Sequence, residues 1–274
     1  MIGKLYLVAT PIGNLDDITL RAIKVLQEVD IIAAEDTRHS LKLLNHLKIS
    51  KPLISYHRHN EEVKSEVLIK DILDGKNVAL ISDAGTPGIS DPGEEIVKQA
   101  IKNNITVVPI PGACALINAL IASGMDTKEF TFLGFLPLNK KNRNEKLKQI
   151  EQATNTCILY EAPHKLNTTL QDLSKILENR KIVLAKEITK IHESFIFGTA
   201  TELVKKIENP KGEFVIIIEK NGTLKDENID FLNNLSLEGH FNFYISQGLS
   251  KNEAIKKIAK DRNVNKNEIY KKFI

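Results

Sequence analysis

The feature of this sequence that most limits its fold is the regular alternation of short apolar runs and amphipathic stretches in its first half. The apolar runs lie at 5–9, 31–34, 53–55, 78–81 and 106–110. The stretches between them carry apolar residues at helical spacing, as in Leu20, Ile23 and Leu26. Strands separated by helices of this length form right-handed βαβ units, so the pattern predicts an α/β fold with a mainly parallel sheet.

A second α/β unit is expected from about residue 124, after a Ser-Gly-Met-Asp stretch that interrupts the apolar pattern. Its predicted strands lie at 130–135, 156–160, 181–186, 195–198 and 213–219, and its helices at 140–151 and 163–177. Pro163 suits the first turn of its helix, because the N–H that proline lacks has no partner there.

The last part of the chain differs from the rest in charge. The segment after a polar stretch at 221–234 has a helix–turn–helix pattern, with a Ser250–Glu253 capping box. Residues 240–274 contain eight Lys or Arg and three acidic residues, a net charge of +5 in a chain whose total is +3. This distribution favours a polyanionic partner at the basic end, although a solvated lysine-rich helix explains the same charges. The predicted domains are 1–123, 124–222 and 240–274, with a linker at 223–239.

Length and cysteine content limit the number of domains and the kind of protein that this chain can be. A chain of 274 residues with 42% hydrophobic residues suits two compact domains and a small appendage. No apolar run approaches the roughly 18 residues that span a bilayer, and the N-terminus lacks the features of a signal peptide. Cys114 and Cys157 form neither a metal-binding cluster nor a disulfide framework, so we expect a cytoplasmic protein without a membrane span or a metal ion.

Three loops rich in Gly and Pro directly follow predicted strands, at 10–17, 82–93 and 109–114. Open α/β sheets bind ligands at the carboxyl ends of their strands, and glycine lets a ligand approach the main chain. The second loop has the glycine spacing of a phosphate-binding loop, but Glu94 and Glu95 stand where Lys and Ser or Thr are required. No G-x-G-x-x-G follows the first strand, so neither a triphosphate nor a dinucleotide is supported.

The chemistry of these loops fits another kind of ligand. They offer carboxylates, hydroxyls and backbone groups, which suit a molecule with ribose hydroxyls and a cationic centre but no phosphate. S-adenosylmethionine fits that description. The alternative interpretation is that these loops are only tight turns and bind no ligand.

Nine segments along the chain match, in order, the motifs of one family. They are VATPIGNLDDIT (8–19), AEDTR (34–38), HxHNE (57–61), SDAGTPGISDPG (82–93), PGACA (111–115), GFLP (134–137), YEAPHK (160–165), ITKxHE (188–193) and GEFV (212–215). On these motifs the chain resembles the small-subunit ribosomal RNA (cytidine 2′-O) methyltransferases of the tetrapyrrole-methylase superfamily. The likeness covers essentially the whole chain, and the segment at 82–93 is its most specific part.

The resemblance implies a two-domain tetrapyrrole-methylase-like fold with a small C-terminal helical, helix-turn-helix-like domain. S-adenosylmethionine would bind in the cleft between the two domains. The residues implied for this cofactor are Pro11, Ile12, Asp83, Gly85, Thr86, Ala113, Cys114 and Tyr160. The implied activity is 2′-O-methylation of a cytidine ribose in the decoding region of 16S ribosomal RNA, by a homodimer, on free RNA or an assembled 30S subunit.

Such a reaction requires two positioned reactants and a group that takes the proton of a ribose hydroxyl. Glu161, His164 and Lys186 are the candidates, although Glu161 and Lys186 could instead form structural pairs. The expected RNA contacts are Lys165, Lys256, Lys257, Lys260, Arg262, Lys271 and Lys272.

Three positions depart from the family pattern. Asp16 stands where Gly is common, so the tip of the first loop could differ from the family in conformation or charge. Lys165 replaces the usual Arg, a change that keeps the charge but removes a bidentate phosphate contact. Ile188 replaces a common Leu, which is conservative.

Two other functions are compatible with parts of the sequence. A methylase of a small corrinoid precursor would share the superfamily, but the basic tail and the SDAGTP motif argue against it. A DNA-binding regulator could use the tail as a helix-turn-helix, but it would have no reason to bind S-adenosylhomocysteine.

Overall fold

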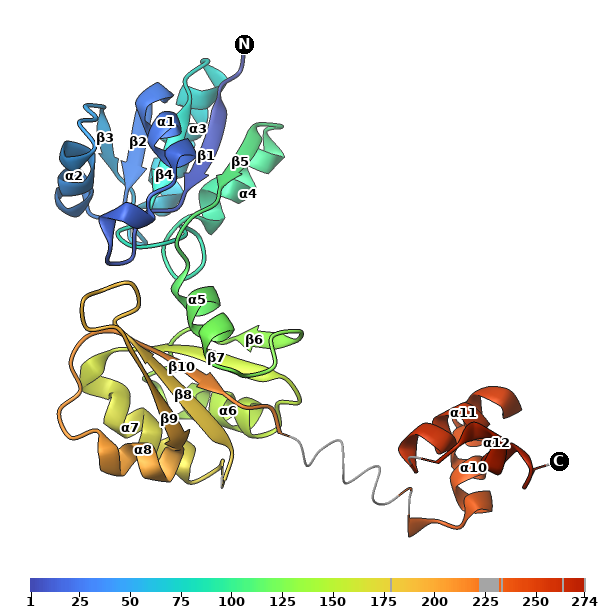
Figure 1. The fold of residues 1–274 in the computed structure, drawn as a ribbon. Helices are drawn as coiled ribbons and strands as arrows, with labels where there is room; N and C mark the ends of the chain where they lie inside the picture. Colours follow the sequence, from blue (N-terminus) through green and yellow to red (C-terminus); the bar gives the residue numbers. More distant parts are fainter. Residues whose placement is uncertain (178, 222–231, 233, 263, 274) are drawn as a thin grey trace.

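The computed structural model describes residues 1–177, 179–221, 232, 234–262 and 264–273. Within these ranges the chain forms two five-stranded sheets with their helices, followed by a group of C-terminal helices (Figure 1). The predicted α/β class, with two sheet-containing units and a small helical unit, is confirmed. Much of the predicted linker at 223–239 lies outside the described residues, and the predicted domain boundaries stay predictions.

The first sheet is entirely parallel, with the strand order β3-β2-β4-β1-β5. Its strands are β1 (Lys4–Val8), β2 (Ile31–Ala34), β3 (Leu53–Ser55), β4 (Val78–Ile81) and β5 (Thr106–Ile110). Helices α1 (Leu20–Glu28) and α2 (Thr37–His46) pack on one face, and α3 (Glu61–Leu73) and α4 (Glu94–Lys102) pack on the other. Because the strands run in one direction, the loops at their carboxyl ends meet at one edge of the sheet.

The second sheet has the order β6-β7-β10-β8-β9 and is mostly antiparallel, with only β6 and β7 running in parallel. Its strands are β6 (Phe130–Phe132), β7 (Thr156–Glu161), β8 (Lys181–Lys186), β9 (Ser194–Thr199) and β10 (Phe214–Ile218). Helices α6 (Lys140–Glu151), α7 (Pro163–Ser174) and α8 (Ala200–Lys206) cover one face, around Leu159, Leu170 and Ile216.

Helix α5 (Ala115–Ala122) covers the other face of the second sheet. It follows the last strand of the first sheet, yet Leu116 and Leu120 are buried against Val183 and Ile217 of the second. In Figure 1 this helix lies between the two sheets. The loop at 109–114 therefore leads from the ligand-binding edge of one sheet directly onto the other, which brings residues of both units to one place.

Two predicted elements end earlier than expected, for local reasons. The strand predicted at 130–135 stops at Phe132, and Gly134 takes a positive φ of 65° that a strand cannot continue through. The helix predicted at 163–177 stops at Ser174, because the N–H groups of Lys175 and Ile176 turn back to carbonyls three residues earlier.

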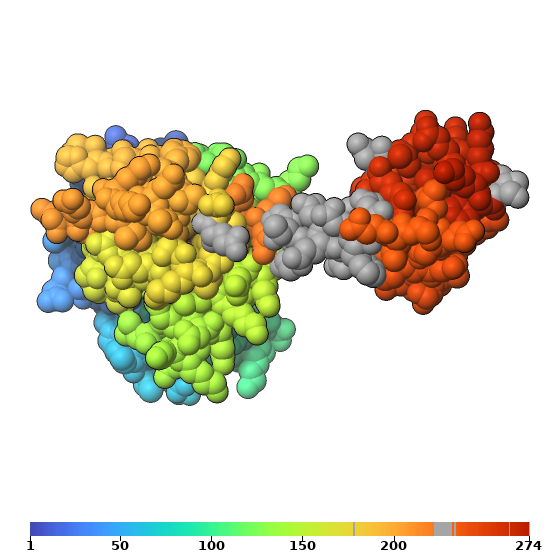
Figure 2. Space-filling view, turned by 90° about the horizontal axis from the view of Figure 1, so that it is seen from below, coloured from blue at the N-terminus to red at the C-terminus, as the bar shows by residue number. Residues whose placement is uncertain are grey.

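The C-terminal helices α10 (Leu237–Ser246), α11 (Lys251–Asp261) and α12 (Lys266–Tyr270) have a core of their own. Ile255, Ile258 and Ile269 are buried in it, and the predicted Ser250–Glu253 capping box begins α11. Figure 2 shows the surface of these helices, in red, apart from that of the two sheets. In the described part of the chain, no helix combines the length and apolar character needed to cross a membrane.

Candidate active site: a cavity between the two sheets

The three loops that the sequence singled out are joined to one another by hydrogen bonds. The backbones of Thr10 and Gly85 exchange two such bonds, with N–O distances of 2.9 and 3.0 Å. The hydroxyl of Thr86 donates to the carbonyl of Ala113 at 3.2 Å. These bonds fix the loops as one surface at the carboxyl edge of the first sheet.

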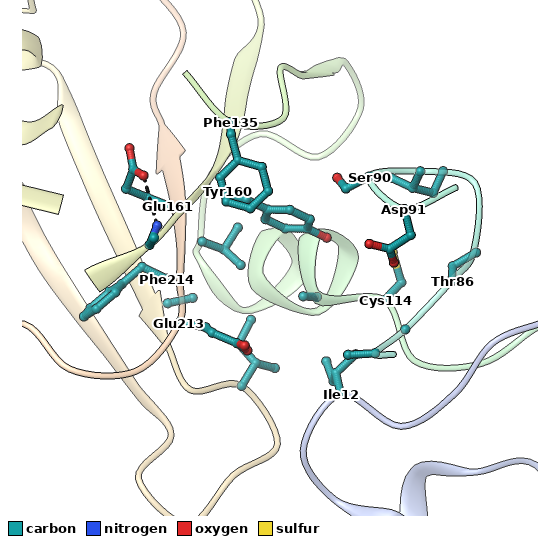
Figure 3. Close-up of a pocket in the computed structure, with 18 of the residues that line it drawn as sticks. Ile12, Thr86, Ser90, Asp91, Cys114, Phe135, Tyr160, Glu161, Glu213 and Phe214 are labelled. Carbon is teal, nitrogen blue, oxygen red and sulfur yellow. Dashed lines mark hydrogen bonds between the residues drawn. The ribbon is translucent and has the colours of Figure 1, made fainter. Parts of the chain in front are cut away.

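This surface forms one wall of a cavity of about 500 Å³ whose other wall belongs to the second unit (Figure 3). The lining is mostly apolar, with a few polar groups, and no Lys or Arg is among the residues that line it in the described part of the chain. The first unit and the start of α5 contribute Ile12, Gly85, Thr86, Ser90, Asp91 and Cys114, and the second contributes Phe135, Tyr160, Glu161, His164, Glu213 and Phe214, among others.

Tyr160 is fixed in the wall of this cavity at the end of β7. Its ring makes edge-to-face contacts with Phe132 and Phe135, with centroid distances of 4.8 and 5.8 Å. Its hydroxyl oxygen accepts a hydrogen bond from the backbone N–H of Leu116 at 3.2 Å. Burial, with a smaller contribution from Cys114, raises the pKa of Tyr160 to about 12, so the phenol stays protonated at neutral pH.

Three carboxyl groups gather where the loops after β2 and β4 meet. Burial raises the pKa of Asp91, an effect opposed by a hydrogen bond with Ser82. Burial together with the neighbouring Asp91 and Asp83 raises the pKa of Glu35 to about 7. Arg58 lowers the pKa of both Glu35 and Asp91, and its guanidinium donates to the carbonyl of Ser90. Of these carboxyl groups, only that of Asp91 lines the cavity.

The structure divides the predicted cofactor residues into two groups. Ile12, Gly85, Thr86, Cys114 and Tyr160 line the cavity. The others help to shape the loops: Pro11 and Asp83 line a small adjacent hollow, and Ala113 supplies the carbonyl that Thr86 binds. One carboxylate oxygen of Asp83 also accepts the backbone N–H of Asp36 at 3.0 Å. Contact with the cofactor remains a prediction for each of them.

The three candidate proton acceptors lie in different surroundings. Glu161 lines the cavity but is only 4% exposed, and both its oxygens are bound, to the Thr169 hydroxyl at 2.6 Å and the Ala162 N–H at 2.9 Å. His164 also lines the cavity and is exposed in the first turn of α7. Lys186, the last residue of β8, is not among the lining residues.

The predicted RNA contacts also separate into two kinds. Lys256 and Lys260 are exposed on α11, and Lys271 and Lys272 are exposed in the turn after α12. Lys165 lies in the first turn of α7, outside the cavity lining. The ammonium of Lys257 lies 4.9 Å from the centre of the Tyr244 ring. Arg262 is bound inside the C-terminal fold: its guanidinium donates to Nδ1 of His240 at 3.2 Å and to the carbonyls of Leu232 and Leu235 at 3.3 and 2.5 Å.

Several lining residues were not singled out from the sequence. Ser90, Asp91, Phe135, Glu213 and Phe214 all lie within the family motifs at 82–93, 134–137 and 212–215. The motifs therefore carried a signal for these residues. Which side chain of each motif reaches the cavity depends on the turn of the loop or the pleat of the strand, and the motif does not specify that.

The cavity fits a cation-bearing ligand without phosphate. Gly85 has a positive φ of 85°, and a Cβ atom there would lie 3.1 Å from Cγ2 of Ile12 and 3.5 Å from the carbonyl oxygen of Ala113. Glycine at this position therefore lets the loops pack closely and expose backbone to the cavity without strain. A carboxylate, hydroxyls and aromatic rings line the space, and phosphate-binding cations are missing from its described lining. No three His, Cys, Asp or Glu side chains of the described chain converge as metal ligands would.

Comparison with known proteins gives close relatives of the chain. It is 50% identical over 270 residues to "Ribosomal RNA small subunit methyltransferase I" of Halalkalibacterium halodurans, covering 98% of this chain and 93% of that one. The protein of that name from Bacillus subtilis is 47% identical over 272 residues, with the same coverage. These relatives confirm the resemblance that the motifs indicated.

Solved structures show the same fold at low identity. A diphthine synthase superposes with a TM-score of 0.64 at 15% identity, covering 79% of this chain and 90% of that one. A uroporphyrin-III C-methyltransferase from Thermus thermophilus, "complexed with S-adenyl homocysteine", superposes with a TM-score of 0.55 at 17% identity, covering 78% and 97%. The model of the Tetrapyrrole (Corrin/Porphyrin) Methylases matches residues 4–204, most of both sheets. The chain therefore belongs to the tetrapyrrole methylases, whose methyl donor is S-adenosylmethionine.

Proposed function

We propose that this methylase transfers a methyl group to the 2′-oxygen of a cytidine ribose in 16S ribosomal RNA. The observation that carries the proposal is the 50% identity to a ribosomal RNA small subunit methyltransferase over 98% of this chain, basic C-terminal helices included. The family motifs read from the sequence supply the finer part, a cytidine and its 2′-oxygen. We also propose that the enzyme is a homodimer and acts in the cytoplasm, where its substrate would be found.

The cavity supports the donor half of this reaction. S-adenosylmethionine supplies an activated methyl group, and transfer leaves S-adenosylhomocysteine. Ile12, Gly85, Thr86, Cys114 and Tyr160 would hold the donor, largely through backbone and apolar contacts. Because the donor is already activated, the main task of the protein is to align two reactants and keep water away. The aromatic side chains in the wall contribute to the second task.

The C-terminal helices support the acceptor half. Lys256, Lys260, Lys271 and Lys272 are exposed, as cations that attract RNA phosphates must be. A ribose hydroxyl stacked in a regular RNA helix could not enter a cavity shared by two sheets, so the acceptor would be a splayed or single-stranded nucleotide. Attachment by the lysines and chemistry in the cavity are then separate tasks.

The test is methyl transfer to defined acceptors. Labelled S-adenosylmethionine is offered with unmethylated 16S ribosomal RNA, with 30S subunits and with a porphyrinoid. The product is digested to nucleosides and examined by mass spectrometry. We expect 2′-O-methylcytidine from one of the ribosomal acceptors. Methyl found on a base, or on the porphyrinoid alone, would contradict the proposal.

A further inference from the structure

Asp91 is the acidic residue that the loops of the first sheet bring to the cavity. It lies in the loop between β4 and α4, within the SDAGTPGISDPG segment. Figure 3 shows its carboxylate and the hydroxyl of Tyr160 on facing walls of the cavity, with Ser90 beside them. The electrostatic influence of Asp91 and of Cys114 on Tyr160 places the three side chains in one neighbourhood.

The other carboxyl groups that line the cavity in the described chain are already engaged. Glu161 is buried and uses one oxygen for the Thr169 hydroxyl and the other for a backbone N–H. Glu213 is exposed, and its carboxylate pairs with the ammonium of Lys190 at 3.1 Å. Asp91 has one hydrogen-bond partner, Ser82, and no salt bridge is found for it within the described residues. It is therefore the lining carboxylate that we consider best able to accept a proton.

We infer that Asp91 is a catalytic residue that accepts the proton of the ribose hydroxyl during methyl transfer. This inference rests on the proposed function. The hydroxyl proton moves to a carboxylate oxygen of Asp91 as the 2′-oxygen forms its bond to the methyl carbon. The bond between that carbon and sulfur breaks, and its electron pair stays on sulfur. The carboxylic acid of Asp91 then releases the proton to solvent.

The surroundings of Asp91 make its carboxylate a stronger base than an exposed one. Burial and the neighbouring Asp83 raise the pKa of Asp91, whereas Ser82 and the charge of Arg58 lower it. Glu35, whose own pKa is raised to about 7, is influenced by the same carboxyl group. Tyr160 faces Asp91 from the other wall, and Cys114 lies beside it (Figure 3). A carboxylate whose pKa is raised is a stronger base than an exposed one.

The first experiment compares Asp91→Asn with the unaltered enzyme in single-turnover methyl transfer. We expect the rate to fall by about 10²–10⁴-fold, because general-base contributions have that size. Binding of S-adenosylhomocysteine, measured by calorimetry, should stay within about threefold. Glu94→Gln is the matched control, since Glu94 is an exposed acid near the same loop that pairs with Lys98. The rate of the unaltered enzyme should also fall as the pH drops through the pKa of Asp91. The rate of Asp91→Asn should not show this dependence on pH.

The second experiment does not depend on turnover. In the presence of S-adenosylhomocysteine, binding is compared between RNA with ribose and RNA with 2′-deoxyribose at the acceptor position. A hydrogen bond from the 2′-hydroxyl to a carboxylate should make the unaltered enzyme prefer ribose by at least about tenfold, and Asp91→Asn should lose most of that preference.

The outcomes separate this inference from the proposed function. If the unaltered enzyme methylates the ribose and Asp91→Asn keeps its rate within about threefold, the proposed function stands and the role of Asp91 is wrong. An equal preference for ribose in both proteins also overturns the role of Asp91. If the unaltered enzyme transfers no methyl to a ribose oxygen, the proposed function fails and the inference fails with it.

Discussion

Gly85 shows how a single residue can hold the active-site loops together. It binds Thr10 through two backbone hydrogen bonds while its positive φ of 85° keeps a side chain out of the space beside Ile12. Gly88, in the same loop, has a similar φ of 80°, but a Cβ there would meet no atom within 4 Å. Both glycines therefore adopt a conformation that would strain an alanine, and they differ in how close neighbouring atoms lie to an added Cβ.

The variant Gly85→Ala should lose both stability and cofactor affinity. A left-handed conformation costs an alanine about 1–2 kcal/mol, and the added Cβ would press on Ile12, which lines the cavity. Gly88→Ala should show a similar loss of stability while binding S-adenosylhomocysteine normally. Denaturant unfolding and calorimetry measure the two effects. Equal affinity in the two variants would show that crowding at Gly85 does not shape the site.

The sequence predicted the position of some functional residues better than that of others. Gly85 and Tyr160 were predicted in the site from their motifs and do line the cavity. Asp91 lay in the same motif as Gly85 without being predicted, because a motif does not show which side chains of a loop turn inward. Arg262 was predicted as an RNA contact from charge alone, and its guanidinium also bonds to His240 and Leu235 inside the C-terminal fold, so its contact with RNA stays a prediction. Charge along a sequence does not reveal which cation is needed inside the fold.

At the scale of elements, a chain of polar contacts ties α6 and α7 to the end of β7. The guanidinium of Arg143 on α6 donates to Asp172 at 2.9 Å and to the Thr169 hydroxyl at 3.0 Å. That hydroxyl in turn donates to Glu161 at 2.6 Å. Since Glu161 follows Tyr160 directly, these contacts position the part of the cavity wall that the second sheet supplies.

Replacing Thr169 by Val should break this chain with little change in side-chain volume. Thr169 is fully buried, so the variant would leave an oxygen of Glu161 and a donor of Arg143 without their partner. We expect a loss of about 1–3 kcal/mol in the free energy of unfolding, measured by urea denaturation. Thr168→Val, at an exposed neighbouring position, is the control and should unfold at nearly the unaltered urea concentration. Unchanged stability in Thr169→Val would show that these contacts do not hold the second unit.

Element bounds were largely predictable and strand order was not. The strands of the first sheet match the predicted runs closely, because each is a short apolar run between helices. In the second sheet β10, late in the chain, lies between β7 and β8. A local pattern of apolar residues predicts that a strand forms, but it contains no information about which distant strand will pair with it.

At the scale of the whole molecule, the cavity has a lining without basic side chains among the described residues, whereas the C-terminal helices present several exposed lysines. The cavity lies between the sheets and no lysine or arginine lines it in the described chain, whereas α11 and the residues around α12 present several lysines to solvent. The C-terminal helices have their own core, so changes on their surface need not disturb the sheets. RNA attachment and cofactor binding should therefore respond independently to substitution.

Neutralising the two exposed lysines Lys256 and Lys260 on α11 tests this separation. Affinity falls as salt rises, and each lysine–phosphate pair on a single strand contributes about 0.7 to the steepness of log affinity against log salt. The Lys256→Gln/Lys260→Gln variant should therefore make this dependence shallower by roughly 1.4. S-adenosylhomocysteine affinity should not change, because neither residue lines the cavity. Lys42→Gln/Lys102→Gln, which removes the same charge from the first unit, is the control, and filter binding of 16S RNA at several salt concentrations is the measurement. If the control pair reduces the slope as much, the effect comes from net charge, and the C-terminal helices are not the RNA anchor.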